Sequence, residues 1–166
     1  MKNLAKLISV RIFQPVYKCS DYRNNATSSF PNTPEEKIQF AKDRGLSDAE
    51  IEAIKKIVSS DQPKRIEEGK QNKHIPGTKE FMQKQLENQK KGLPPPGEVI
   101  GDINQLQGIV NIFHGTGRPI VDGKGNFQNK EIVELPFAIG FADGKTPTNK
   151  ISIHYSKNGT HIVPRL

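Results

Sequence analysis

The spacing of hydrophobic positions along the chain changes near residue 115. Before this point, apolar residues recur at intervals of three and four, which is the period of an amphipathic helix. After it, they form short runs separated by turn dipeptides such as Asp-Gly and Asn-Gly, as in an antiparallel sheet. Helices followed by strands predict an α+β fold, with N-terminal helices packed on a four- to five-stranded antiparallel meander.

Four helices are predicted, each from a capping signal and an apolar face. The first two follow the N-cap residues Thr33 and Ser47, each with a glutamate three positions later, which completes a capping box. The third spans residues 78–91, and the fourth begins near Asp102 and ends before the Gly-Thr-Gly at 115–117. The second helix exposes more acid than base, so the first pair is interpreted as a packing or linker hairpin rather than a helix-turn-helix.

Runs of β-branched and aromatic residues after the last helix predict the strands. They cover residues 119–121, 127–133, 137–141, 150–156 and 160–163.

The last two strands form a predicted hairpin around Asn158-Gly159, a dipeptide that suits a type I′ turn. This turn places Ser156 opposite His161, and His154 opposite Val163. The two histidines then share one face as diagonal neighbours, with Cβ atoms roughly 7–8 Å apart. The other face is apolar and carries Ile151, Ile153, Tyr155 and Ile162.

The net charge of +7 favours an anionic partner. Residues 144–166 include no Asp or Glu but contain four basic residues, and both hairpin histidines lie within this stretch. A hydrophobic fraction of 33% leaves only a small core. The predicted division is a flexible segment at 1–32, a short helical hairpin or linker at 33–66, and a domain at 67–166 that folds by itself.

Several protein classes are excluded by composition. The single cysteine, Cys19, cannot form an intramolecular disulfide or a thiolate metal cage. Lys6 and Arg11 interrupt the apolar residues at 4–16, which makes that segment a poor signal peptide, and no apolar run approaches the length of a membrane span. A serine hydrolase is disfavoured because the chain has no Gly-x-Ser-x-Gly motif.

Histidines on a basic sheet face suit the cleavage of RNA. The 2′-OH is the nucleophile, so the protein must supply a base, an acid and cations that stabilise the phosphorane. Imidazole, with an unperturbed pKa of about 6.5, serves either proton task. We assign His154 and His161 to these tasks without deciding which is the base, with Ser156 as a hydrogen-bonding partner and Lys150 and Lys157 as phosphate contacts. A histidine-only zinc site is the alternative, although it requires a third protein ligand.

Other motifs are better explained by structure than by chemistry. His114 stands beside glycines and is interpreted as structural. The Gly-Thr-Gly at 115–117 lacks the Gly-Lys-Ser/Thr of a phosphate loop and is interpreted as a helix stop. Aromatic residues that could stack on bases are mostly expected in the core. They are Phe127, Phe137, Phe141 and Tyr155.

Segments 68–78, 115–117, 129–133 and 153–164 resemble, in that order, the polymorphic toxin type 50 domain. That domain is found at the C-termini of bacterial secreted toxins and of some phage minor head proteins. The resemblance covers residues 67–166, whereas residues 93–97 and the first 66 residues depart from it. It implies the fold shared by barnase, EndoU and RelE-type nucleases, whose open sheet face cleaves RNA without a metal ion. It also adds His74 as a third catalytic candidate.

The combined hypothesis is a metal-independent endoribonuclease toxin that leaves a 2′,3′-cyclic phosphate, needs no cofactor, and has tRNA as its expected substrate. An acidic immunity protein is the expected partner, with no membrane contact. Delivery by a secretion system or carrier protein would bring the toxin to the target-cell cytoplasm. The expected RNA contacts are Lys73, Arg118, Lys150, Lys157 and Arg165. The alternative is a noncatalytic nucleic-acid-binding module of a phage head or secreted structural protein.

Overall fold

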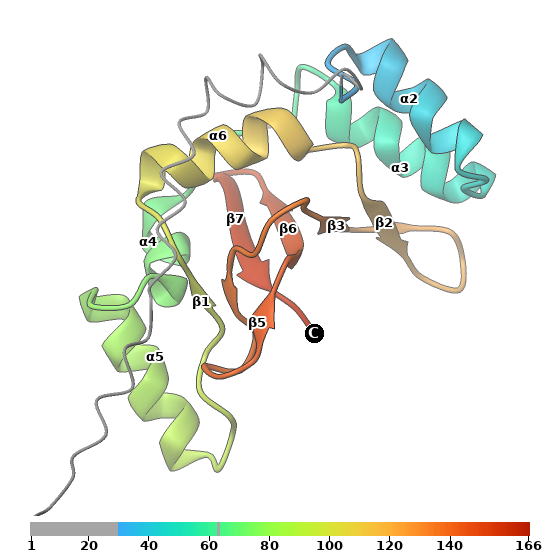
Figure 1. Cartoon of the computed structure of the whole chain (residues 1–166). Coiled ribbons are helices and arrows are strands. Elements are labelled where there is room, and N and C mark those ends of the chain that lie inside the picture. Colours follow the sequence, from blue (N-terminus) through green and yellow to red (C-terminus); the bar gives the residue numbers. More distant parts are fainter. Residues whose placement is uncertain (1–29, 63) are drawn as a thin grey trace, which may run out of the picture.

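The computed structural model describes residues 30–62 and 64–166 of the chain. These residues form helices and two antiparallel sheets, of four and three strands, which confirms the α+β class (Figure 1). Most of the segment 1–32, including Cys19, lies outside the described residues.

The capping signals place the starts of all four predicted helices correctly. Thr33 caps α2 and Ser47 caps α3, and in each the glutamate at the third helical position completes a capping box. Thr78 caps α5 and Asp102 caps α6 in the same way, through side-chain oxygens that accept backbone N–H groups. The four helices are α2 (Pro34–Asp43), α3 (Asp48–Val58), α5 (Lys79–Lys90) and α6 (Ile103–Phe113).

Two short helices between α3 and α5 were not predicted. They are α4 (Glu68–Gln71) and the 3₁₀ helix η1 (Asn72–His74). A buried side chain holds them against the sheet: the Gln71 amide donates to the carbonyl of Ile162 at 3.2 Å and accepts from its N–H at 2.7 Å. This contact joins residues 91 positions apart, so the local sequence pattern does not contain it.

The larger sheet is the predicted antiparallel meander, in the order β2-β3-β6-β7. Its strands are β2 (Arg118–Val121), β3 (Phe127–Glu134), β6 (Lys150–Ser156) and β7 (Gly159–Pro164).

The strand predicted at 137–141 is wrong in extent and in position. Only β4 (Gly140–Phe141) is a strand, and it lies between β1 (Glu98–Val99) and β5 (Pro147–Thr148) in the second sheet. The chain leaves the larger sheet directly after β3, where Pro136 has no N–H to continue a ladder. As a result β3 pairs with β6 without an intervening strand.

The predicted register of the last hairpin is also wrong. His154 lies directly opposite His161, and Ser156 lies opposite Gly159, so the loop consists of Lys157 and Asn158. Gly159 is needed for another reason: its φ is +137°, and a Cβ there would lie 2.4 Å from the carbonyl oxygen of Arg65. The error shifts each cross-strand partner by two positions. Because side chains alternate with a period of two, each one remains on the face that was predicted for it.

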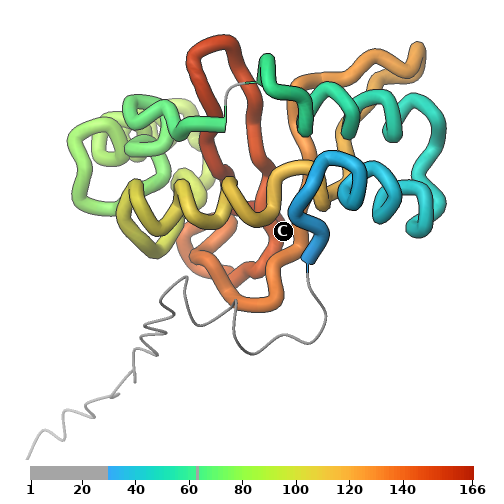
Figure 2. The backbone as a smooth tube through the Cα atoms, turned by 90° about the horizontal axis from the view of Figure 1, so that it is seen from above, coloured from blue at the N-terminus to red at the C-terminus, as the bar shows by residue number. Residues whose placement is uncertain are grey.

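The core lies between one face of the larger sheet and the helices α3 and α6 (Figure 2). Ile54 and Ile57 of α3 are fully buried in the same cluster as Leu106 of α6 and Ile153 of β6. The α2–α3 pair therefore shares its core with the sheet. The sequence-based boundary at residue 66 divides two parts of the chain that pack together.

Candidate active site

Three of the four histidines gather on the sheet face that is turned away from the core. We call this the histidine face, and on β6 and β7 it carries Ser152, His154, Ser156 and His161. The ring centroids of His154 and His161 are 4.6 Å apart, and those of His161 and His74 are 6.3 Å apart with the rings nearly parallel at 13°. His161 is therefore the central ring of the group.

Backbone pairing and one hydrogen bond orient these rings. His154 and His161 are cross-strand partners, and the Gln71 contact fixes η1, which ends at His74, beside β7. The His74 Nδ1 lies 2.9 Å from the carbonyl oxygen of Gly97. A carbonyl can only accept, so Nδ1 carries the proton and Nε2 of the neutral ring is left with a lone pair.

Burial keeps all three imidazoles neutral in the free protein. Burial, together with the nearby His161 and Lys130, lowers the pKa of His154 to about 3. It lowers the pKa of His161 to about 4, with His74 and Lys70 acting in the same direction and Glu67 opposing them. It also lowers the pKa of His74. Burial is thus the main cause of all three pKa shifts, and neighbouring charges add to it.

A polar group beside His161 was not foreseen as a unit. The Lys70 Nζ lies 2.8 Å from Glu67 Oε2 and 3.5 Å from Ser156 Oγ. The Ser156 Oγ also lies 2.9 Å from the carbonyl oxygen of Gly159 and 3.3 Å from Glu67 Oε2. Lys70 lies in the family-like segment 68–78, which was its only sequence signal.

The predicted RNA-binding cations divide into three places. Lys73 and Arg165 are close enough to the histidines to lower their pKa values. Lys157 is in the exposed hairpin loop. Arg118 and Lys150 lie toward the far end of the same face, and the Arg118 Nε is 2.6 Å from Glu50 Oε1.

Lys130 is a further cation of the site, and sequence reasoning missed it. It lies opposite His154, and its charge lowers the pKa of that residue. Its place follows from the β3–β6 register, which the wrongly placed strand at 137–141 concealed.

Two polar atoms on the histidine face are buried without hydrogen-bond partners. They are Ser152 Oγ and His154 Nε2, and only Asn88 Oδ1 joins them in this class within residues 30–62 and 64–166. Buried polar atoms are normally paired, so two unpaired ones at alternate positions of β6 call for an explanation.

His114 and the Gly-Thr-Gly segment belong to a buried network on the core side. The N–H groups of Gly115 and Gly117 donate to the Glu131 carboxylate at 2.8 and 3.0 Å, and the Tyr155 hydroxyl donates to it as well. His114 donates from Nδ1 to the Val110 carbonyl at 2.8 Å. The segment binds an internal carboxylate rather than a phosphate, in keeping with its interpretation as a structural stop.

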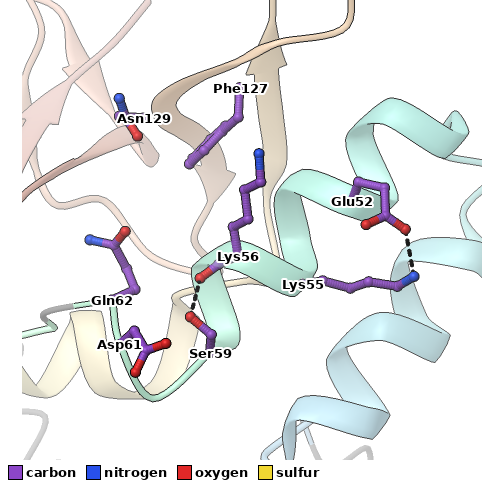
Figure 3. A pocket seen from close by; sticks show the side chains of 8 residues that line it. All are labelled: Glu52, Lys55, Lys56, Ser59, Asp61, Gln62, Phe127 and Asn129. Carbon is purple, nitrogen blue, oxygen red and sulfur yellow. Dashed lines mark hydrogen bonds and ion pairs between the residues drawn. The ribbon is translucent and has the colours of Figure 1, made fainter.

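A cavity of about 420 Å³ lies apart from the histidines (Figure 3). Its lining comes mainly from α3 and the residues that follow it, and the Phe127 ring in it lies 6.3 Å from that of Tyr155 on the core side of the sheet. Cavity size alone therefore does not locate the site.

Among the described residues, no group of three or more His, Cys, Asp or Glu side chains is arranged to hold a metal ion. No helix of this part of the chain has the length and apolar character to cross a membrane.

The family model described as Bacterial toxin 50 matches residues 66–164. Among curated proteins there is no match to the chain. The matched segment covers more than half of the chain and contains all four histidines, the Gly-Thr-Gly loop and every strand of both sheets. The chain therefore belongs to the bacterial toxin 50 family and carries a bacterial toxin domain.

Proposed function

We propose that the protein is a metal-independent endoribonuclease toxin that uses histidine acid–base catalysis. The observation that carries the proposal is the group of three histidines, His74, His154 and His161, surrounded by cations on a sheet face. A base removes the proton of the RNA 2′-OH, which attacks the adjacent phosphorus. An acid then protonates the leaving 5′-oxygen, so the products carry a 2′,3′-cyclic phosphate and a free 5′-OH.

The spacing of the rings favours His74 and His161 as the acid–base pair. The rings of His154 and His161 are in contact, with centroids 4.6 Å apart, and Nε2 of His154 is buried, so His154 is less accessible to a substrate. The His74 and His161 rings are parallel and 6.3 Å apart, and the free Nε2 of His74 suits a general base. In this proposal His161 is the acid, and His154 packs against it and orients its ring.

The bound phosphate supplies the protonation state that the acid requires. His161 has a pKa of about 4 in the free protein, because burial and neighbouring positive charge disfavour the imidazolium. A phosphate anion beside the ring reverses the second effect and raises the pKa. Lys70 and Lys130 then neutralise the charge that develops on the phosphorane.

The proposal extends to the partners of the toxin. The basic surroundings of the histidines suit a phosphate backbone, with tRNA as the proposed substrate, and an immunity protein with an acidic surface would cover the same face. Delivery into a competing bacterium and action in its cytoplasm complete the proposed role.

Incubation of total RNA with the full chain in excess EDTA tests the proposal. We expect cleavage, with cyclic phosphate at the new 3′ ends, and no cleavage by the matched variant His161→Ala. Activity that EDTA abolishes and Zn²⁺ restores would assign the histidines to metal binding instead. Retention of RNA without cleavage would favour the noncatalytic binding module, which rests on the net charge of +7.

A further inference from the structure

A second cavity lies at the far end of the histidine face, and it has no part in the proposed chemistry. Its volume is about 320 Å³, at the small end of the range for ligand pockets. The sheet contributes Arg118, Ile132, Glu134 and Lys150 to its lining. The rest comes from Phe30, from Phe40 and Arg44 at α2, from Phe113 of α6 and from Thr116 and Gly117 in the loop after it.

Strand register shows that the sheet residues of this cavity share a face with the histidines. Ile132 pairs with Ser152, and Glu134 pairs with Lys150, so all four side chains point to one side of the sheet. Lys150, Ser152 and His154 occupy every second position of β6, which puts all three on the histidine face. An RNA strand bound across the histidines can therefore continue into this cavity.

The distance between the histidines and the cavity determines which part of a bound RNA strand reaches the cavity. Lys150 and His154 are four residues apart on β6, or about 13 Å at roughly 3.3 Å per residue. A cavity this far from the histidines cannot hold the scissile phosphate, but it can hold the base of an adjacent nucleotide. The Ser152 Oγ, buried and unpaired, lies between the two places.

The lining has the chemistry of a nucleobase site. Phe40 presents a ring that already carries the guanidinium of Arg44 at 5.1 Å from its centroid, and both aromatic rings and guanidinium planes stack on unpaired bases. Glu134 is exposed and offers two acceptor oxygens, while Lys150 and Arg118 supply positive charge for the adjoining phosphate. Two acceptors side by side match the adjacent N–H donors on the Watson–Crick edge of guanine.

We infer that this cavity is a base-specificity subsite, which takes a guanine flanking the cleaved bond. The inference rests on the proposed function, because it assumes an RNA strand on the histidine face. It also explains why Arg118 and Lys150 lie away from the histidines, since they would contact the phosphate of the flanking nucleotide.

Two measurements test the subsite, and the first needs cleavage. Sequencing of the ends that the full chain produces from a random RNA pool should show enrichment of guanine at one position beside the cut. Glu134→Gln should reduce this enrichment about tenfold, the usual discrimination of one bidentate contact. Glu35→Gln, an exposed carboxylate on α2 outside the cavity, is the matched control and should leave the enrichment as it is.

The second measurement is independent of cleavage. Guanosine, adenosine, cytidine and uridine monophosphates are titrated by NMR into the full-length His161→Ala variant, with Phe40 and Ile132 signals as reporters. Tightest binding of the guanine nucleotide, weakened by Glu134→Gln and by Phe40→Leu, is expected. Binding of this kind without any RNA cleavage would remove the proposed function and keep the subsite. Equal binding of all four nucleotides, or shifts confined to the histidines, would overturn the subsite.

Discussion

His161 shows how neighbouring rings set each other's chemistry at the scale of single residues. It touches His154 on one side and faces His74 on the other, so a proton on any ring raises the cost of a proton on the next. Burial acts in the same direction on all three. The three rings therefore form one electrostatically coupled group.

This coupling predicts different pH dependences for free and bound enzyme. Loss of the protonated acid limits the rate as pH rises, and loss of the deprotonated base limits it as pH falls. With the pKa of His161 at about 4 and that of His74 also lowered, both limits of kcat/KM move to lower pH, and its optimum should lie below about 6.5. The kcat optimum should lie higher, because bound phosphate raises both pKa values.

Initial rates with a short RNA between pH 4 and 8, fitted separately for kcat and kcat/KM, check this prediction. A kcat/KM optimum above about pH 7.5 would show that the free histidines are not depressed in pKa.

Substitution of the proposed pair should separate catalysis from folding. His74→Ala and His161→Ala should each slow RNA cleavage by roughly 10²–10⁴-fold, the usual share of a general acid or base. The thermal unfolding midpoint of each variant is measured beside the rate. Lys145→Ala, which removes an exposed cation in the loop after β4, is the control and should keep the wild-type rate.

The role of His154 decides between the two possible pairings. In the proposed arrangement His154→Ala still leaves a base and an acid, so its pH profile stays bell-shaped although the rate falls. If His154→Ala removes one limb of the profile while His74→Ala keeps both, then His154 and His161 are the pair.

At the scale of secondary structure, sequence signals predicted the features that depend on contacts between residues close together in the chain. The caps Thr33, Ser47, Thr78 and Asp102 bond to backbone within their own helices, so the sequence contains the whole interaction. The helix η1 that carries His74 depends instead on Gln71 and Ile162, far apart in the chain. His74 was found through the family resemblance, and no periodicity could have placed it beside β7.

The hairpin register failed for a related reason. Asn158-Gly159 was assigned to the turn, but Gly159 lies in β7, where the chain at Arg65 passes too close for a side chain. The face of each histidine could still be predicted, because strand alternation is a local property. The contact between His154 and His161 could not, since it depends on the residue that ends the loop.

The Gly-Thr-Gly loop gives a prediction about folding. A Cβ on Gly117 would lie 2.4 Å from the carbonyl oxygen of Ile132 and 2.9 Å from Glu131 Oε2, so backbone must shift and the buried carboxylate loses a donor. Gly117→Ala should therefore lower the free energy of unfolding by about 3 kcal/mol. Gly123→Ala, where nothing lies within 4 Å, is the matched control.

Urea denaturation followed by circular dichroism measures both glycine variants. Equal unfolding midpoints for Gly117→Ala and Gly123→Ala would show that the Glu131 network contributes little to stability.

At the scale of the whole molecule, the family match and the physical domain have different boundaries. The matched segment begins at residue 66, yet α2 and α3 precede it and share its core. Ile54 and Ile57 are fully buried, and Ala41 is only 2% exposed. The segment around residue 66 also pairs with β7. The Thr160 N–H donates to the Arg65 carbonyl, and the Glu67 N–H donates to the Thr160 carbonyl, both at 2.8 Å.

From this packing we predict that residues 67–166 do not fold by themselves, in contrast to the sequence-based expectation. Removal of residues 1–66 also removes Ile54 and Ile57 from the core. Burial of these two side chains contributes about 3–6 kcal/mol to stability, at roughly 1.5–3 kcal/mol for each. That loss is comparable with the whole stability of many domains, about 5–15 kcal/mol.

A fragment 67–166 should therefore show no cooperative thermal transition, whereas a fragment 30–166 should unfold cooperatively. Limited proteolysis of the full chain gives an independent measure, and the protected core is expected to include α2 and α3. If the shorter fragment instead unfolds cooperatively near the midpoint of the longer one, the α2–α3 pair is an accessory to a self-sufficient toxin domain.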